Sequence, residues 1–276
     1  MIRSLYSGSS GMKNHQIRMD VIGNNIANVN TNAFKSSRVD FQDMLYQSVR
    51  SASANGAATS STLGGTNPAQ IGLGMSVAGI TNNMGPSGFQ NTGRTLDLAI
   101  QGNGWFVVSP DDGTTCYYTR EGVFHIDDAG DLVNSIGYKV LDTDGDVINF
   151  GTAGVGTINI STDGTITATD LTGTDIYTAA TGPKIGLAMF TNQDGLERNG
   201  QNLFKESVAS GAPINTFGTA GAGGYGTINS GFLEMSNVNL TDEFVDMITT
   251  QRGYQANGRV ITTSDQMLQE LLDLKR

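Results

Sequence analysis

The chain has 276 residues, 37 of them glycine, and 26 acidic against 16 basic side chains give it a net charge of −10. Its charged fraction of 15% lies below the roughly 25% of ordinary globular proteins, and weakly charged, glycine-rich sequence is typical of many short strands. Because it has one cysteine, no apolar run of about 18 residues and no apolar stretch behind its N-terminus, we expect no disulfide framework, no transmembrane helix and no secretory signal peptide.

The first predicted element is an N-terminal helix of about 28 residues. Its apolar residues recur at seven-residue spacing, at Leu5, Met12, Met19 and Ile26. A second row follows three positions behind the first, at Gly8, His15, Ile22 and Val29. Four heptads on one face predict a helical seam. The asparagine-rich stretch 28–32 favours turns, so we expect the helix to end there.

The middle of the chain predicts a connecting region followed by an all-β domain. Residues 33–70 form the connection, in which 51–67 is nearly pure Ser, Ala, Gly, Thr and Asn and is typical of a flexible segment. Over 71–236, short strand-like runs alternate with turns. The predicted strands are 96–100, 105–109, 116–119, 123–126, 138–141, 157–160, 185–191 and 227–235. Asp-Gly pairs predict hairpin turns at 112–113, 144–145, 163–164 and 194–195.

The last predicted element is a longer C-terminal helix. One apolar row repeats every seven residues, at Leu240, Met247, Tyr254, Ile261 and Leu268. A second row lies four positions further on, at Phe244, Gln251, Gly258, Asp265 and Leu272. Asn239 is the expected N-cap, with Asp242 in the first turn.

The two ends together predict an α+β fold, in which the terminal helices (1–32 and 237–276) pair as a coiled-coil stalk that carries the inserted β domain. Net charges of +2 and −2 oppose neither a parallel nor an antiparallel pairing. Since two helices leave much of each apolar stripe exposed, we expect further copies of the chain to cover the remainder. The candidate self-assembly residues are Leu5, Met12, Met19, Ile22, Ile26, Leu240, Phe244, Met247, Tyr254, Ile261, Leu268 and Leu272.

No motif makes a positive case for an enzyme, so we expect no catalytic residue, cofactor or metal. The glycines of 221–226 fit a dinucleotide fingerprint, but no predicted strand precedes them. The aspartates of 142–146 resemble a calcium loop but lack the flanking helices of an EF-hand, so we expect a hairpin turn there, with cation binding left open. His15 and His125 are expected to pack, and Cys116 to be a buried thiol. No basic stripe with aromatic residues indicates a nucleic-acid partner.

Six groups of motifs are distributed along the chain: MDVIGNNIANVNT (19–31) with Phe34-Lys35, GRTLDLAI (93–100) with 104–106, YTREGVF (118–124), SNVN (236–239), QRGYQAN (251–257) and TTSDQML (262–268). These motifs resemble those of the flagellar rod and hook axial proteins. The resemblance covers nearly the whole chain. One departure is Ala33, where the family usually has glycine; if that position needs a positive φ, the local turn must differ here.

The resemblance implies a subunit with paired terminal helices in an inner tube and a β domain outside it. Such subunits polymerise helically around an export channel, and the flagellar export apparatus delivers them outside the cell without signal cleavage. Implied partners are the protein itself, rod proteins, the hook cap and the hook-filament junction proteins. We expect a compact hook subunit of Gram-positive type, with the distal rod as the alternative. A secreted β-domain hydrolase or adhesin with oligomerising ends is a remote alternative.

Overall fold

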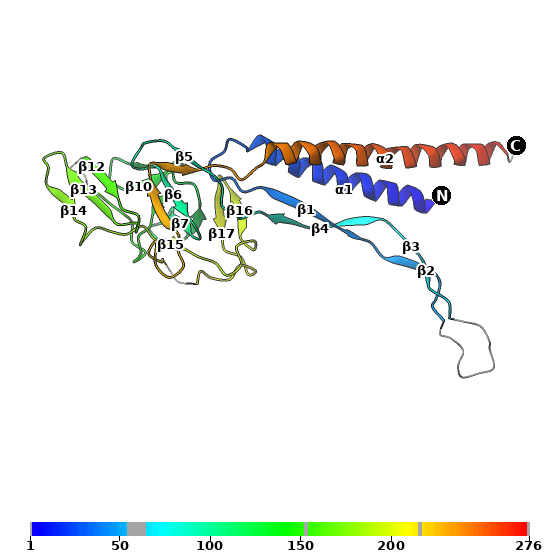
Figure 1. The fold of residues 1–276 in the computed structure, drawn as a ribbon, viewed down its shortest axis with the longest axis horizontal. Coiled ribbons are helices and arrows are strands. Elements are labelled where there is room, and N and C mark those ends of the chain that lie inside the picture. The colour runs from blue at the N-terminus through cyan, green and yellow to red at the C-terminus, as the bar shows by residue number, and fades with distance from the viewer. Residues whose placement is uncertain (1, 54–64, 152–153, 215–216, 275–276) are drawn as a thin grey trace. The chain divides into compact units, whose positions relative to one another are not determined.

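The computed structural model, which describes residues 2–53, 65–151, 154–214 and 217–274, has a helix near each end and a β-rich middle (Figure 1). The helices are α1 (Ile2–Ala27) and α2 (Leu240–Asp273). The chain forms two compact units: unit 1 contains Met1–Ala27, Ser37–Asn82 and Asn239–Arg276, and unit 2 contains Asn28–Ser36 and Asn83–Val238. The predicted mixture of helices and strands is confirmed. The bounds expected for the terminal helical domain (1–32 and 237–276), the connecting region (33–70) and the β domain (71–236) stay predictions.

Local signals place the helix ends. The Asn239 backbone is extended, and its side-chain oxygen accepts a hydrogen bond of 3.1 Å from the Thr241 N–H, so Asn239 is the predicted N-cap of α2. At the end of α1, the Thr31 N–H donates to the Asn28 carbonyl across a turn. Val29, predicted on the helical seam, therefore lies beyond the helix, because the asparagine-rich turn stops α1 at Ala27.

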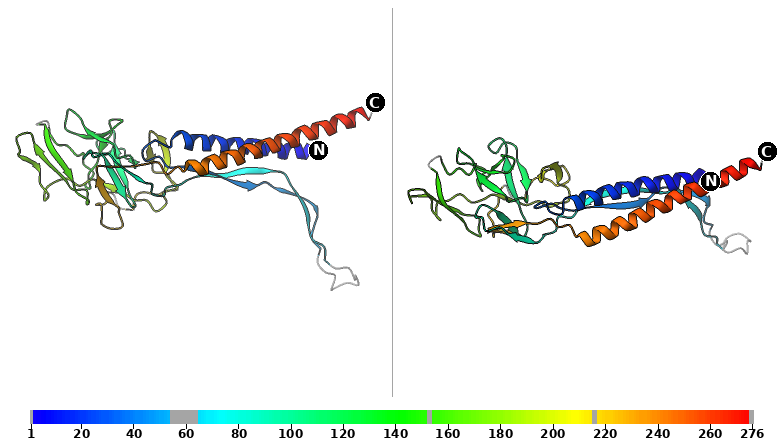
Figure 2. Two further views of the ribbon diagram at one scale, coloured as in Figure 1. Left: turned by 45° about the horizontal axis from the view of Figure 1, so that its top comes forward. Right: turned by 90° about the horizontal axis from the view of Figure 1, so that it is seen from above.

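Unit 1 also contains a long two-stranded ribbon, and Figures 1 and 2 show its β1–β4 part beside α1 and its β2–β3 part bending away from the helix. Its strands are β1 (Ser37–Asp43), β2 (Tyr46–Arg50), β3 (Ala69–Gly72) and β4 (Met75–Asn82). β1 pairs antiparallel with β4, and β2 with β3. Of the segment expected to be flexible, 54–64 lies outside the described residues, while Ser53 and Thr66 form an antiparallel bridge at its base.

Unit 2 contains the β domain. Its strands are β5 (Phe89–Asn91), β6 (Leu98–Gln101), β7 (Trp105–Ser109), β8 (Tyr117–Thr119), β9 (Phe124–Ile126), β10 (Leu132–Asn134), β11 (Lys139–Val140), β12 (Val155–Ile160), β13 (Ile166–Asp170), β14 (Asp175–Tyr177), β15 (Leu187–Ala188), β16 (Glu197–Gly200), β17 (Leu203–Lys205), β18 (Thr227–Ser230) and β19 (Phe232–Glu234). The largest sheet has the order β16-β17-β8-β7-β11-β10-β9, with β15 also on β7. Smaller sheets are β12-β13-β14, β18-β6 and β19-β5.

Every predicted strand run overlaps an observed strand, and three of the four predicted Asp-Gly turns have the backbone that such turns need. Gly113, Gly145 and Gly164 have φ values of 94°, 88° and 80°, which glycine adopts without steric cost. In the β domain, the strands β5, β10, β13, β14, β16 and β17 were not predicted. The buried core centres on β7, where Phe106 packs edge-to-face on Phe124 with ring centroids 5.3 Å apart. This core belongs to unit 2 alone.

Candidate functional site

The two helices of unit 1 pack antiparallel through small and polar side chains. Facing pairs run in opposite directions along the helices: Ser4 with Ser264, Gly8 with Ile261, Gly11 with Asn257, Arg18 with Asp246 and Asn25 with Glu243. A Cβ added to Gly8 would lie 3.2 Å from the Ile261 side chain, and one added to Gly11 would lie 2.6 Å from Asn257. The glycines therefore allow the two backbones to approach closely.

The second row of α2 in this contact differs from the predicted one. The predicted row ran through Phe244, Gln251, Gly258, Asp265 and Leu272, whereas the residues that face α1 or are buried are Glu243, Thr250, Asn257 and Ser264. Thr250 and Ser264 are 1% and 2% exposed, but Phe244 and Leu272 are 50% and 68% exposed. Along this row small and polar side chains meet, since Gly11 of α1 faces Asn257 and Ser4 faces Ser264.

The β1–β4 ribbon also contacts α1. The Asn14 side chain donates a hydrogen bond of 2.6 Å to the Met75 carbonyl at the start of β4. The Asn25 amide binds both backbone groups of Ser37 in β1, donating to its carbonyl at 2.8 Å and accepting from its N–H at 3.0 Å. α1 is thus packed against α2 and against the ribbon, while α2 packs on α1 and is otherwise largely exposed.

His15 stands where α1, α2 and β1 meet. A Cβ added to Gly253 of α2 would lie 2.9 Å from the His15 ring, and Phe41 of β1 contacts the same ring edge-to-face, at a centroid distance of 5.9 Å. Its Nδ1 is buried and has no hydrogen-bond partner among the described residues. Burial first, and Arg18 second, lower the pKa of His15. This agrees with the packing role expected from the sequence.

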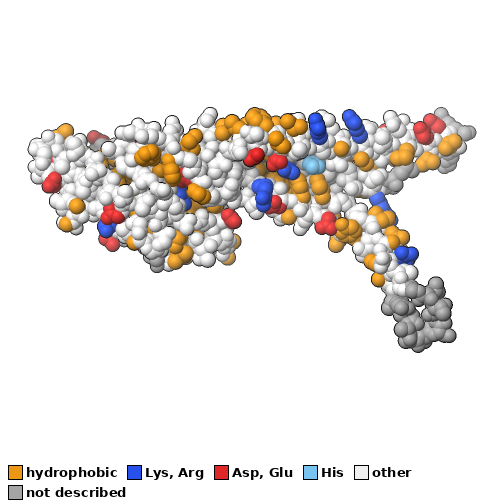
Figure 3. Space-filling view, in the orientation of Figure 1, with side chains coloured by type: hydrophobic (Ala, Val, Ile, Leu, Met, Phe, Trp, Pro, Cys, Tyr) orange, Lys and Arg blue, Asp and Glu red, His pale blue; other side chains and the backbone are white. Residues whose placement is uncertain are grey.

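Beyond its contact with α1, α2 exposes many large apolar side chains, here called its outer side, and orange side chains on α2 are visible in the space-filling view of Figure 3. Each is 39% to 83% exposed: Leu240, Phe244, Val245, Ile248, Tyr254, Val260, Met267, Leu271, Leu272 and Leu274. The ribbon adds a second exposed apolar set: Met44, Leu45, Tyr46, Val49, Ile71, Leu73 and Ile80. Apolar surfaces this extensive mark interaction sites in soluble proteins.

The twelve predicted self-assembly residues fall into three groups by burial. Ile22 is buried, at 4% exposure. The half-buried members are Leu5, Met12, Met19, Ile26, Met247, Ile261 and Leu268. The exposed members are Leu240, Phe244, Tyr254 and Leu272. Only some of the set therefore lies in contacts inside the chain, and the assembly role of the exposed members stays a prediction.

Unit 2 contains a buried charge cluster that sequence analysis did not identify. The Lys35 Nζ lies 2.6 Å from Glu234 Oε1 and donates to the Gly85 carbonyl at 3.0 Å, while Arg120 Nη1 lies 3.5 Å from Glu234 Oε2. The three charged side chains are 0% to 4% exposed. Burial lowers the pKa of Lys35 and of Arg120, and Glu234 opposes both shifts. Lys35 and Arg120 occur in the matched motifs, but sequence alone does not distinguish buried from exposed charges.

The cluster helps to hold residues 28–36, here called the linker, against the β domain. Ala33 has a φ of +57°, and its N–H donates to the Glu234 carbonyl at 2.8 Å. The position therefore has a positive φ, which the buried Ala33 adopts although it is not glycine. The expected difference from the turn of the family stays a prediction. The Asn202 side chain donates to the Asn32 carbonyl at 3.2 Å, which ties the linker to the β16–β17 turn.

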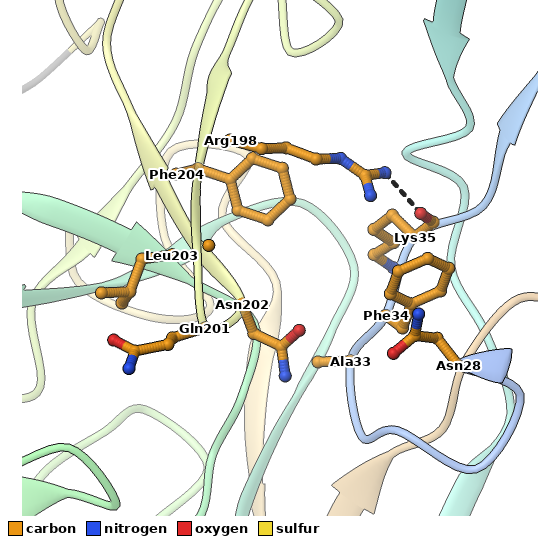
Figure 4. Close-up of a pocket in the computed structure, with 10 residues that line it drawn as sticks. Asn28, Ala33, Phe34, Lys35, Arg198, Gln201, Asn202, Leu203 and Phe204 are labelled. Atoms are coloured by element: carbon orange, nitrogen blue, oxygen red, sulfur yellow. Dashed lines mark hydrogen bonds between the residues drawn. The ribbon is translucent and has the colours of Figure 1, made fainter. Parts of the chain in front are cut away.

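A pocket of about 180 Å³ lies between the linker and that hairpin (Figure 4). It is lined by Asn28, Ala33, Phe34, Lys35, Arg198, Gly200, Gln201, Asn202, Leu203 and Phe204. The Arg198 guanidinium carbon lies 5.3 Å from the centre of the Phe34 ring and 5.8 Å from that of Phe204. Arg198 also donates a hydrogen bond to the Lys35 carbonyl. The pocket is therefore aromatic and cationic.

The aspartates of 142–146 and Cys116, which the sequence analysis considered as site candidates, have structural surroundings. Asp142 and Asp146 close a hairpin turn, in which the Asp142 N–H donates to the Asp146 carbonyl at 2.9 Å. Cys116 is half-buried rather than fully buried, and burial raises the pKa of its thiol. Within the described parts of the chain, no three His, Cys, Asp or Glu side chains are grouped so as to hold a metal, and no helix is both long and apolar enough to cross a membrane.

Three family models match successive parts of the sequence. "Flagella basal body rod protein" matches residues 5–35, which include most of α1 and nearly all of the linker. "Flagellar hook protein FlgE/F/G D1 domain" matches 99–168 in the β domain. "Flagellar basal body rod FlgEFG protein C-terminal" matches 229–274, which contains α2.

Full-length relatives agree with these matches. The chain is 50% identical to the flagellar basal-body rod protein FlgG of Bacillus subtilis over the whole length of both proteins. It is 40% identical to the FlgG protein of Buchnera aphidicola from Acyrthosiphon pisum, over 99% of this chain and 100% of that one. The flagellar hook protein FlgE of Borreliella burgdorferi is 30% identical over all of both chains. The chain therefore belongs to the flagellar rod and hook family of axial structural proteins.

Proposed function

We propose that this protein is a subunit of the distal flagellar rod, the drive shaft of the basal body. Support comes from the rod proteins that it resembles over their whole length, at identities of 50% and 40% against 30% for a hook protein. The hook, which the sequence analysis favoured, is thus less well supported than its alternative. The coarser assignment to the flagellar axial structure is common to both.

The observation that carries the proposal is the exposed apolar side of α2. Covering a half-exposed side chain such as Phe244 or Ile248 contributes about 1 kcal/mol, so ten such side chains supply a strong drive to associate. A contact between different faces of identical copies, repeated by rotation and rise, builds an open helical tube. We therefore propose that α1 and α2 form a coiled-coil stalk, and that the twelve self-assembly residues predicted above contribute to contacts within and between subunits.

Further parts of the proposal follow from the family. The partners are the other rod proteins, the hook components and the flagellar export apparatus, which delivers the subunit outside the cytoplasm without cleavage of a signal. We propose no enzymatic activity, and purified protein should show no turnover of peptidoglycan, peptides or esters. Hydrolysis abolished by changing Asp142 or Asp144 would instead favour the secreted hydrolase.

Electron microscopy of basal bodies from a deletion strain distinguishes rod from hook. A rod subunit predicts truncated rods without hooks, and complementation with the intact gene restores them. Completed rods that lack only the hook would overturn the rod assignment in favour of the hook. A complete flagellum in the deletion strain would overturn both.

Two matched variants test the outer side of α2 in the purified protein. Ile248 is 51% exposed and apolar, and Gln251 is an exposed polar residue one turn further along. In the monomer, both I248D and Q251D should leave the melting temperature nearly unchanged. We expect I248D to block polymerisation, since burying a carboxylate in an apolar contact is costly, and Q251D to polymerise. Normal polymers of I248D would show that this surface is not an assembly contact.

A further inference from the structure

Arg198 is a half-buried cation without a carboxylate partner. The ion pairs among the described residues include Lys35, Arg94, Arg120 and Lys139 of unit 2, but not Arg198. Its Nε is buried and has no hydrogen-bond partner among those residues. Burial, with no opposing carboxylate, lowers its pKa. A guanidinium taken partly out of water is stabilised when a carboxylate joins it.

The pocket beside Arg198 has the size and lining for an acidic side chain. Its volume of about 180 Å³ holds one side chain rather than a large ligand. The Phe34 and Phe204 rings offer apolar faces to the methylene stem, and the guanidinium can bind a carboxylate through two hydrogen bonds. The amides of Gln201 and Asn202 add polar groups to the wall.

The charge distribution indicates where such a carboxylate comes from. Unit 1 contains nine acidic and nine basic residues, whereas unit 2 contains 17 acidic and seven basic residues and so carries the whole net charge of −10. Several of these acids stand at exposed turns, Asp144 and Asp163 among them. When copies assemble, the β domain of a neighbour is a dense source of carboxylates for Arg198.

We propose that the Arg198 pocket receives an aspartate or glutamate side chain from the β domain of a second copy. This inference rests on the proposed polymer. The contact would neutralise Arg198 where it also holds the linker, through Phe34 and the Lys35 carbonyl. A neighbour seated there would therefore rigidify the segment that directly follows α1.

The first experiment probes the pocket in the full-length monomer, independently of polymerisation. Sodium acetate is titrated against sodium chloride of equal ionic strength while the Nε–H resonance of Arg198, assigned with R198Q, is followed by NMR. Acetate should shift this resonance and chloride should not. If acetate causes no shift, the pocket does not take a carboxylate and the proposal is wrong.

The second experiment compares polymerisation of R198Q with that of F34L, which removes a pocket wall but keeps the charge. In 50 mM salt we expect R198Q to polymerise at least tenfold more slowly than the wild type, and F34L to remain within about threefold. Melting temperatures of the monomers control for folding. Equal losses in both variants would make Arg198 merely structural, and an unaffected R198Q would show that no neighbour uses it; either result overturns the proposal.

The two experiments together separate this inference from the proposed function. If acetate shifts the resonance but R198Q polymerises normally, the pocket takes a free carboxylate and not a neighbour. If the wild-type protein forms no polymer under any condition, the proposed function fails, and an acetate shift then again indicates a free ligand. If R198Q forms rod polymers as stable as those of the wild type, the Arg198 contact is refuted and the proposed rod function is unaffected.

Discussion

Glu234 is the residue whose loss should destabilise unit 2 most, because it is the carboxylate shared by two buried cations. Its Oε1 binds Lys35 Nζ at 2.6 Å and accepts from Ser87 at 3.0 Å, and its Oε2 lies 3.5 Å from Arg120. Replacing it by glutamine keeps the shape but removes the charge. Lys35 and Arg120, at 0% and 4% exposure, would then face each other without a counter-ion.

The expected magnitude follows from this geometry. Breaking a fully buried ion pair by removing one partner costs about 3–5 kcal/mol, and E234Q leaves two cations unpaired, so the upper half of that range applies. K35M should cost less, about 1–3 kcal/mol, because Glu234 keeps Arg120 and Ser87. At roughly 2–4 °C per kcal/mol for a unit of this size, E234Q should lower the melting temperature by about 10 °C.

The assay uses the single tryptophan of the chain. Trp105 is fully buried in unit 2, with the Arg120 guanidinium 5.4 Å from its ring, so its fluorescence reports the unfolding of this unit. D112N is the control, since Asp112 forms an exposed pair with Lys139, which keeps Asp131, and its loss should cost less than 1 kcal/mol. The reasoning would be refuted if the free energy of unfolding of E234Q lay within 1 kcal/mol of the wild-type value, or if K35M were less stable than E234Q.

Three further predictions concern glycine, histidine and Ala33. G253A should lower the free energy of unfolding of the helices, followed by circular dichroism, by about 1 kcal/mol, because the added Cβ meets His15. G23A, whose added Cβ has nothing within 4 Å, should raise that free energy by about 1 kcal/mol. Equal changes in the two variants would contradict this prediction. Because the folded pKa of His15 lies below its ordinary 6.5, the helical unit should lose stability as pH falls from about 6.5, and this slope should be smaller in H15Q. Burial raises the pKa of Glu243, so protonation of Glu243 stabilises the folded state as pH falls and opposes the effect of His15. Subtracting the stability of H15Q from that of the wild type at each pH removes this contribution. A33V should destabilise unit 2 by about 2–4 kcal/mol, since a branched residue is strained at φ +57°, while A33G should stay within about 1 kcal/mol, as measured by Trp105 fluorescence.

What could be predicted from the sequence depended on local information. The cap at Asn239, a helix end next to the asparagine-rich stretch 28–32 and the Asp-Gly turns at 112–113, 144–145 and 163–164 each need only a few neighbouring residues, and they are confirmed. The hairpin turn predicted at 194–195 was wrong, because the strands on its two sides, β15 and β16, do not pair with each other. Strand order could not be predicted, because β18 pairs with β6 across more than a hundred residues. The β1–β4 ribbon was missed for the same reason, since its strands pair across the segment between them.

The candidate site was only partly predictable, because heptad rules assume that apolar residues pack inside the chain. In α2 the row that meets α1 includes Thr250 and Ser264, and Phe244 lies outside it. The buried trio of Lys35, Arg120 and Glu234 was invisible for a different reason. Its members are far apart in the sequence and look like ordinary surface charges until the fold brings them together.

The composition of the helix contact explains why so much of α2 remains exposed. Glycine on α1 and short polar residues on α2 bring the backbones close, and many large apolar side chains of α2 stay outside this contact. The larger apolar side chains point elsewhere, in a unit whose acidic and basic residues are equal in number. No net repulsion between copies of unit 1 therefore opposes their burial, whereas copies of unit 2 repel one another through ten excess negative charges each. Net charge therefore leaves association through the helical unit unopposed, whereas a contact between β domains needs a local pairing of opposite charges such as the one proposed at Arg198.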